Sequence, residues 1–176
     1  ASESTITLSV NNIDESAPTI TSGGTAAAVA ENSGAGQVVY TVTSDDSADV
    51  SGGVSYVLGG ADAALMSIDS ASGAVTLTGN PDEESQASYS FTVTATDAAS
   101  NSSEQAVTLS VTDLDEVAPS ITSSATGLVV EDSGANKVVY TVTSDDSGDI
   151  ATGATSYSLK AGSDSALSID SSTGQV

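Results

Sequence analysis

The sequence contains no histidine, cysteine or tryptophan, and lysine is its sole basic residue type. Histidine is the ordinary general base near neutral pH, and cysteine supplies thiol nucleophiles, thiolate metal ligands and disulfides. These absences exclude most enzyme classes. Two basic residues stand against 24 acidic ones, which gives a net charge of −22. Nucleic acid and anionic membrane surfaces are poor partners for such a chain, because both are bound through clustered cations.

Aromatic residues are also scarce, at 3%, although 38% of the residues are hydrophobic. Much of the apolar content is alanine and valine, which predicts a narrow core built from small side chains. No apolar run approaches the roughly 20 residues that a membrane-spanning helix needs, so we expect no direct membrane insertion. No signal peptide is apparent at Ala1, and we interpret the sequence as a middle piece of a longer protein.

An internal repeat of about 101 residues organises the chain. Residues 3–18 (ESTITLSVNNIDESAP) match residues 104–119 (EQAVTLSVTDLDEVAP), and residues 38–47 recur unchanged as residues 138–147. The repeat predicts three parts. These are residues 1–12 as the last strand of a preceding repeat, residues 13–112 as a complete repeat, and residues 113–176 as an incomplete repeat without its last two strands.

Short segments with apolar residues at every second position predict β-strands with one buried face. Four segments show this alternation, with these residues on the expected inner face: Val38, Tyr40 and Val42; Tyr89, Phe91, Val93 and Ala95; Ile6, Leu8 and Val10; and Val107, Leu109 and Val111. Clusters of Gly, Asp, Asn and Ser separate the segments. About seven strands per repeat and no helix predict an all-β fold of tandem Greek-key β-sandwiches, similar to immunoglobulin domains.

Acidic residues gather at strand ends and at the two junctions between repeats, residues 12–18 (NIDESAP) and 113–119 (DLDEVAP). Carboxylates crowded at one hinge repel each other, by about 1 kcal/mol per pair at 4 Å in water. Ca²⁺, with about six to eight oxygen ligands, offsets this repulsion and accepts irregular ligand sets. The alternative is a solvated acidic surface that keeps the protein soluble. The concentration of acids at both junctions favours calcium.

Five segments in one order resemble the motifs of cadherin repeats: residues 30–33 (AENS), 67–75 (SIDSASGAV), 82–84 (DEE), 91–97 (FTVTATD) and 113–119 (DLDEVAP). More narrowly, the chain is similar to the cadherin-like repeats of large bacterial surface adhesins and biofilm-associated proteins. The resemblance implies an extracellular, cell-surface location. It also implies Ca²⁺ ions between successive domains, and we expect two or three at the complete junction.

The resemblance further implies which residues bind these ions. For the junction at residues 113–119 the ligands are Glu31, Asp82 and Glu84 from the repeat above, Asp113, Asp115 and Glu116 from the linker, and Asp145 or Asp146 from the repeat below. For the junction at residues 12–18 they are Asn12, Asp14 and Glu15 from the linker, and Asp45, Asp46 and Asp97 from the repeat below. The latter junction lacks its upper ligands, so we expect weak or incomplete binding there.

Three functions compete. The leading hypothesis is a calcium-rigidified stalk of a bacterial adhesin, which supports adhesion or biofilm formation and has neighbouring repeats as its partners. The alternative is a module that itself binds polysaccharide or another cadherin-like domain. Tyr40, Tyr56 and Tyr89 would suit sugar stacking, but their phase with Val and Phe favours core packing. An enzyme using Asp82 and Glu84 would need a deep cleft, which a loop at a domain edge does not offer.

The two ends of the chain pose a separate question. The second repeat stops at Val176, before the counterparts of residues 89–97 and 104–112, so we expect an exposed edge and an open core. Residues 3–12 pose the opposite problem, because they have the pattern of a strand but no sheet to join. Two interpretations stay open: this strand docks onto a neighbouring chain, or the chain is a fragment.

Overall fold

The computed structural model describes residues 3–50, 52–150 and 153–176. The chain divides into two compact units, Ala1–Asp113 and Leu114–Val176. The first unit contains β1 to β9 and the second contains β10 and β11. The repeat boundaries at residues 12 and 112 stay a prediction from the sequence.

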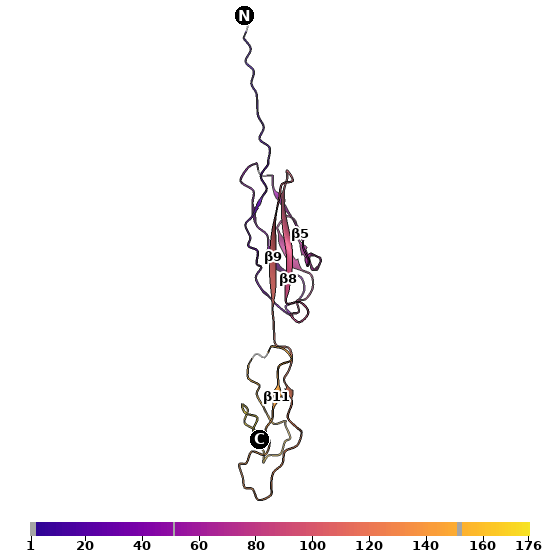
Figure 1. Cartoon of the computed structure of the whole chain (residues 1–176), viewed down its shortest axis with the longest axis vertical. Coiled ribbons are helices and arrows are strands. Elements are labelled where there is room, and N and C mark those ends of the chain that lie inside the picture. Colours follow the sequence, from indigo (N-terminus) through magenta and orange to yellow (C-terminus); the bar gives the residue numbers. More distant parts are fainter. Residues whose placement is uncertain (1–2, 51, 151–152) are drawn as a thin grey trace. The chain divides into compact units, whose positions relative to one another are not determined.

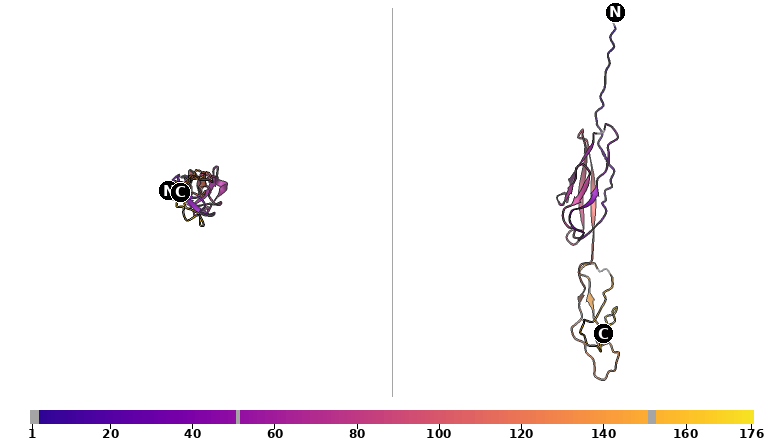
Figure 2. Two further views of the ribbon diagram at one scale, coloured as in Figure 1. Left: turned by 90° about the horizontal axis from the view of Figure 1, so that it is seen from below. Right: turned by 180° about the vertical axis from the view of Figure 1, so that it is seen from behind.

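The first unit is a β-sandwich, and its long strands β8 and β9 lie side by side (Figures 1 and 2). Its elements are β1 (Thr19–Ile20), β2 (Val29–Ala30), β3 (Gln37–Thr41), β4 (Ser44–Asp45), β5 (Val54–Gly59), the 3-10 turn η1 (Ala63–Leu65), β6 (Met66–Ile68), β7 (Ala74–Leu77), β8 (Ser88–Asp97) and β9 (Ser102–Thr112). One sheet has the order β2-β9-β8-β5 and the other β3-β7-β6, while β1 pairs with β4. In the four-stranded sheet β2 alone is parallel to its neighbour.

The core lies between the two sheets, because alternate residues of each strand point inward. The inward residues predicted for β8 and β9 are confirmed, and the facing sheet adds Tyr40, Met66, Val75 and Leu77. Serine and threonine occupy most of the outward positions of β8 and β9. The prediction of an all-β sandwich is therefore confirmed.

The three tyrosines of the first unit are buried in this core, as their phase predicted. The ring of Tyr40 packs edge-on against Phe91, with centroids 5.9 Å apart, and its hydroxyl donates to the Gly23 carbonyl at 2.6 Å. The Tyr56 hydroxyl shares a hydrogen bond of 2.7 Å with Ser44. Each of these two tyrosines thus buries its ring and satisfies its polar end.

The predicted face of β3 is partly wrong. Val38 is 60% exposed, whereas Val39 and Tyr40 are both buried. The pairing of β3 with β7 shifts register between Val38 and Tyr40. Such an irregularity inserts a residue into one strand and breaks its alternation, so two successive side chains point inward. Val42 regains the predicted inner position and is buried.

The segment before Pro18 does not form the predicted strand with a buried face. Residues 3–17 belong to no strand, and Ile6, Leu8 and Val10 are exposed. The physical reason is the lack of a partner: no described residue pairs with this segment, and a strand is stable only within a sheet.

The second unit repeats local contacts of the first with few regular strands. Its β10 (Ser120–Ile121) pairs with β11 (Ser144–Asp145), and Thr141 bridges to Gln175. The Val142 amide donates to the Gly174 carbonyl at 2.9 Å, as Val42 donates to Gly73 in the first unit. Among the described residues, every buried hydrophobic side chain lies in the first unit. The apolar side chains of the described residues in the second unit are therefore partly or largely exposed.

Candidate calcium sites

Acidic side chains meet in three groups within the first unit: Asp14, Asp46 and Asp97; Glu31, Asp82 and Glu84; and Glu83, Glu84 and Asp113. In each group the carboxylate oxygens lie within 4.8 Å of one another. Calcium binds oxygen at about 2.3–2.6 Å, so two ligands of one ion lie at most about 5.2 Å apart. Each group is compact enough to surround one cation.

The first group lies where β8 ends. Asp97 continues the inward phase of β8 and is 6% exposed, while Asp46 follows β4 and Asp14 precedes β1. Asn101 joins two of these residues. Its amide nitrogen Nδ2 donates to Asp97 Oδ2 at 2.9 Å and to the Asp14 carbonyl at 3.2 Å, and its backbone N–H donates to Asp97 Oδ1 at 2.8 Å.

These hydrogen bonds fix the charge of Asp97. Burial is the largest single influence and raises the pKa of Asp97, but hydrogen bonds from the side chain and backbone of Asn101 and from the backbones of Ala99 and Ser100 together outweigh it and hold the pKa below its ordinary value. Asp97 is therefore an anion at neutral pH, in the form that a metal ion binds.

Other residues predicted for this junction make different contacts. The side chain of Asn12 donates to Asp49 Oδ1 at 2.5 Å, and the Glu15 backbone N–H is 3.5 Å from Asp49 Oδ2. Asp45 Oδ1 accepts from the Ser47 backbone at 3.0 Å. Glu15 and Asp45 are not in the group of Asp14, Asp46 and Asp97. Asp49, which could replace one of the predicted ligands Asp45 and Asp46, thus contacts the linker at Asn12 and Glu15.

The other two groups lie where β2 and β9 end together. These strands are parallel, with Ala30 opposite Thr112, so the residues that follow, Glu31 and Asp113, emerge at the same edge. The Glu31 side chain is 2% exposed. Its Oε2 accepts from the Glu83 backbone at 2.8 Å, which fixes the loop that carries Asp82 and Glu84.

Glu84 belongs to both groups at this edge, and Glu83 belongs to one of them. The sequence motif pointed to Asp82 and Glu84, and its middle residue, Glu83, was not among the predicted ligands. Both oxygens of Asp82 accept hydrogen bonds of 3.0 Å from Ser85, and these lower its pKa. Asp82 is thus also an anion at neutral pH.

The first unit offers these groups no basic side chain, because Lys137 and Lys160, the only two in the chain, lie in the second unit. Glu31 and Asp97 are nevertheless almost fully buried. A buried anion is costly unless a cation or a full set of donors balances it. The donor chemistry, several carboxylates within reach of one point, fits a hard divalent cation such as Ca²⁺.

The remaining predicted ligands, Asp115, Glu116, Asp145 and Asp146, lie in the second unit. No group of three acids forms around them in the part of that unit that the structure describes. Asp145 accepts a hydrogen bond of 3.0 Å from the Ser147 backbone, and bonds from Ser147 lower its pKa. The Glu116 backbone N–H donates to Asp149 Oδ2 at 2.9 Å, so Asp149 holds this linker as Asp49 holds the first.

The acid groups thus lie at the ends of a β-sandwich within a repeating chain. The family model of the cadherin domain matches residues 25–112, half of the chain. The chain belongs to the cadherin family.

Solved protocadherin structures share the fold. The protocadherin gammaB7 EC3-6 cis-dimer structure aligns with a TM-score of 0.71 and 26% identity over 99% of this chain and 46% of that one. The protocadherin gammaB4 extracellular domain aligns with a TM-score of 0.68 and 24% identity, over 99% of this chain and 31% of that one. Human protocadherin-24 EC1-2 aligns with a TM-score of 0.58 and 18% identity, over 77% of this chain and 62% of that one. The chain spans less than half the length of the first two. No curated protein matches it significantly.

Cadherin domains are extracellular adhesion and structural modules rather than enzymes, and they typically bind Ca²⁺. The acid groups of the first unit agree with that property. No helix among the described residues is long and apolar enough to cross a membrane.

Proposed function

We propose that this chain is a calcium-stiffened extender of a cell-surface adhesin, of the kind that large bacterial surface and biofilm proteins contain. The observation that carries the proposal is the placement of the acid groups. Because β8 and β9 are antiparallel, Asp97 at the end of β8 and Asp113 after β9 mark opposite ends of the sandwich. An extender needs ion sites at both ends, where it meets its neighbours in a row.

The first unit's own residues would hold the ions. Asp14, Asp46 and Asp97 would bind at one end, and Glu31, Asp82, Glu83, Glu84 and Asp113 at the other. We propose that Asp115 and Glu116 of the linker and Asp145 or Asp146 of the second unit complete the latter site. Bound calcium neutralises the acids and ties the linker to the sandwich that precedes it.

Calcium would also set where the extender is stiff. An ion that binds only the ordered arrangement stabilises it by about 2.7 kcal/mol at a hundredfold excess over Kd. Extracellular calcium modules have Kd values of about 10⁻⁴ to 10⁻³ M. The linker would therefore be rigid outside a cell and loose inside one, where free calcium is scarce. A loose chain also suits export before folding.

Small-angle scattering of the chain with calcium and with a chelator tests this proposal. We expect chelation to broaden the distribution of maximum dimensions, because the uncompensated acids repel each other and release the linker. Glu31→Gln should reproduce part of the change in calcium, whereas Glu104→Gln, an exposed acid outside the groups, should not. Identical scattering with and without calcium would contradict the stalk.

A second candidate function is pairing with another cadherin-like domain. One similar structure is a cis-dimer of protocadherin gammaB7, which supports the idea for this chain. Polysaccharide binding has less support, since Tyr40, Tyr56 and Tyr89 are buried and are not available for stacking on a sugar. Binding of a glycan by the chain alone would reverse this ranking.

A further inference from the structure

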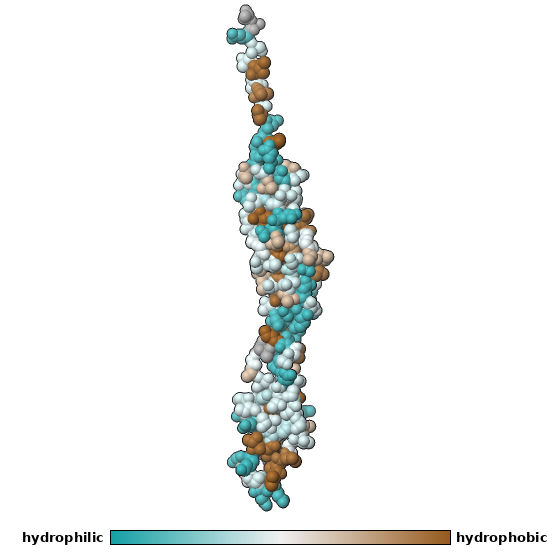
Figure 3. Space-filling view, viewed as in Figure 1, coloured by the Kyte–Doolittle hydropathy of each residue, from teal (hydrophilic) through white to brown (hydrophobic). Residues whose placement is uncertain are grey.

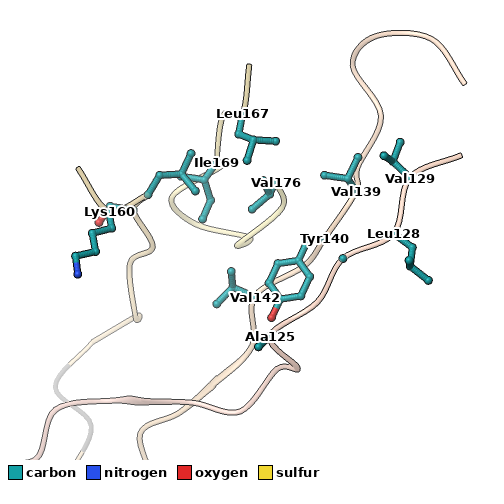
Figure 4. Close-up of a pocket in the computed structure, with 13 residues that line it drawn as sticks. Ala125, Leu128, Val129, Val139, Tyr140, Val142, Lys160, Leu167, Ile169 and Val176 are labelled. Atoms are coloured by element: carbon teal, nitrogen blue, oxygen red, sulfur yellow. The ribbon is translucent and has the colours of Figure 1, made fainter. Parts of the chain in front are cut away.

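Cavities in the two units differ in their lining. One cavity of the second unit is lined mainly by aliphatic side chains, among them Val129, Val142 and Ile169 (Figure 4). A cavity of about 310 Å³ in the first unit instead combines Leu65 and Leu77 with hydroxyl, amide and carboxylate side chains. A lining of this mixed kind suits a small ligand that has both an apolar and a polar part.

Tyr89 is the buried polar residue of the first-unit cavity. Its side chain lines the cavity and is only 7% exposed. The hydroxyls of Tyr40 and Tyr56 have hydrogen-bond partners, whereas no described residue bonds to the hydroxyl of Tyr89. Buried tyrosine hydroxyls usually find a partner. Because this hydroxyl is not fully enclosed, a molecule in the cavity can reach it and supply that partner.

Three polar side chains of the cavity have already used their donors. The Thr78 hydroxyl donates to a backbone carbonyl at 2.7 Å, and the Ser85 hydroxyl donates to Asp82 Oδ2 at 3.0 Å. The Gln86 side-chain nitrogen donates to Asp62 Oδ1 and to a backbone carbonyl, both at 3.1 Å. These side chains therefore offer a ligand lone pairs and not hydrogens. A ligand that fits them must supply the donors.

The cavity also lies in a region of negative charge. Asp82 is part of its lining, and Asp62 accepts a hydrogen bond from Gln86 of the same lining. Burial, and then the charges of Asp62 and Asp82, raise the pKa of Tyr89, so both carboxylates lie close enough to act on its hydroxyl. Figure 3 shows hydrophilic residues, in teal, gathered at the end of the first unit where β9 ends. The cavity therefore favours a positively charged donor.

We propose that this cavity binds a primary aliphatic ammonium group, of the kind that lysine side chains and free alkylamines carry. An ammonium group has three donors and no acceptor. These donors match the Tyr89 hydroxyl, the Gln86 side-chain oxygen and the Asp82 carboxylate, while the carbon chain lies against the two leucines. A guanidinium fits less well, because its planar fork needs a carboxylate open to paired bonds, and both Asp82 oxygens already accept from Ser85.

Asp82 also belongs to an acid group that we propose to bind calcium, so the two sites share one carboxylate. A bound Ca²⁺ repels an ammonium group placed beside it, because like charges interact strongly near a protein surface. Calcium should therefore weaken binding of the amine, and the calcium-free chain should bind it best. This coupling rests on the proposed function, whereas the ammonium site itself does not.

An NMR titration of the calcium-free chain with n-butylammonium tests the proposal. We expect saturable shifts of the backbone amide signals of Gly79, Gln86 and Tyr89, which n-butanol, a neutral analogue of the same length, should not produce. Tyr89→Phe should weaken binding about tenfold, because it removes a hydrogen bond to a charged group. Tyr56→Phe, which removes a hydroxyl outside the cavity, is the matched control. Since Tyr89→Phe breaks no hydrogen bond among the described residues, this variant should fold as the wild type does.

Absence of saturable shifts, equal binding of n-butanol, or equal affinities of Tyr89→Phe and Tyr56→Phe would overturn the site. A lysine blocked at both backbone ends serves as a second probe. Its tighter binding would support a lysine side chain of a partner protein as the source of the ammonium group, and tighter binding of n-butylammonium would support a free amine. A calcium titration of the same sample separates the two proposals: loss of calcium binding alone contradicts the proposed function, and loss of amine binding alone contradicts the ammonium site.

Discussion

Asn101 connects the fold of the first sandwich to its candidate metal site. One side chain contacts Asp97 at the end of β8 and the backbone of Asp14 in the linker. Neither contact was predicted, because Asn101 lies in the turn just before β9 and the sequence there does not show which distant groups its side chain reaches. Asparagine in such turns often bonds neighbouring groups, but the distant partner at Asp14 depends on tertiary structure.

Replacing Asn101 with alanine should lower the free energy of unfolding by about 1–2 kcal/mol, because the change removes partly buried hydrogen bonds of the side chain. The pKa of Asp97 should rise toward its ordinary value, since its main compensating donor is lost. Urea unfolding and an NMR titration of Asp97 measure the two effects. Asn11→Ala, an exposed site in the N-terminal segment, serves as the control. An unchanged Asp97 titration would refute the assigned role.

Asp69 gives a prediction on pH. Its Oδ1 accepts hydrogen bonds from the Ser72 backbone and hydroxyl and from the Ala71 backbone, which lower its pKa in the folded state. The stabilisation is complete above the ordinary aspartate pKa of about 3.9 and is lost as the pH falls through the lower folded value. Asp69→Asn should therefore lose less stability than the wild type over that acid range. An equal loss of thermal stability in the wild type and in Asp69→Asn over the acid range would contradict this role of Asp69.

The turn between β6 and β7 is the element that depends most on one glycine. Gly73 has φ +72°, and a Cβ there would lie 2.6 Å from the Val42 carbonyl oxygen. The second unit repeats the arrangement at Gly174, where the corresponding distance to Val142 is also 2.6 Å. The Thr-Gly or Ser-Gly step of this turn was recognised from sequence, but the close approach to the facing strand was not.

Gly73→Ala should destabilise the first unit by about 2 kcal/mol or more, because alanine combines a left-handed backbone with a collision against a backbone oxygen. Gly79→Ala is the matched control, since a Cβ there meets nothing within 4 Å and its φ is not positive. Denaturant unfolding of both variants measures the difference. Equal unfolding midpoints for the two variants would show that a small backbone shift removes the collision with the Val42 carbonyl at little cost.

The alternation of apolar and polar residues predicted the buried faces of the long strands well and those of the short strands less well. β8 and β9 keep a strict period of two over their buried stretches, so their inner faces follow from the sequence. In β3 the irregularity near Val38 leaves no trace in the order of apolar residues. Ile6, Leu8 and Val10 have the pattern of a strand, but a pattern cannot state whether a partner strand is within reach.

The ligands predicted from the sequence and the acid groups of the structure overlap in part. Asp14 and Asp97 were expected together, and the structure brings them together with Asp46. Asp45 and Asp46 could not be distinguished, because neighbouring residues point in different directions and the turn after β4 decides which carboxylate faces Asp97. Glu83 was missed for a similar reason, since the loop conformation turns its side chain toward Glu84 and Asp113.

At the scale of the molecule, the main feature is the excess of negative charge. The chain carries 24 acidic residues, and the first unit has no basic side chain to offset those gathered at its ends. Without a bound cation this repulsion opposes the fold, and under the proposed function bound calcium would offset it and add stability that depends on the ion. Such a protein would use the calcium concentration of its surroundings to distinguish the outside of a cell from the inside.

Isothermal titration of calcium into the metal-free chain tests the central claim most directly. We predict saturable binding of more than one ion for the wild type and for Glu104→Gln. We expect markedly reduced binding for the double variant Glu31→Gln, Asp97→Asn, which removes one buried carboxylate from each end of the sandwich. Absence of saturable binding, or binding that the double variant leaves unchanged, would contradict the account.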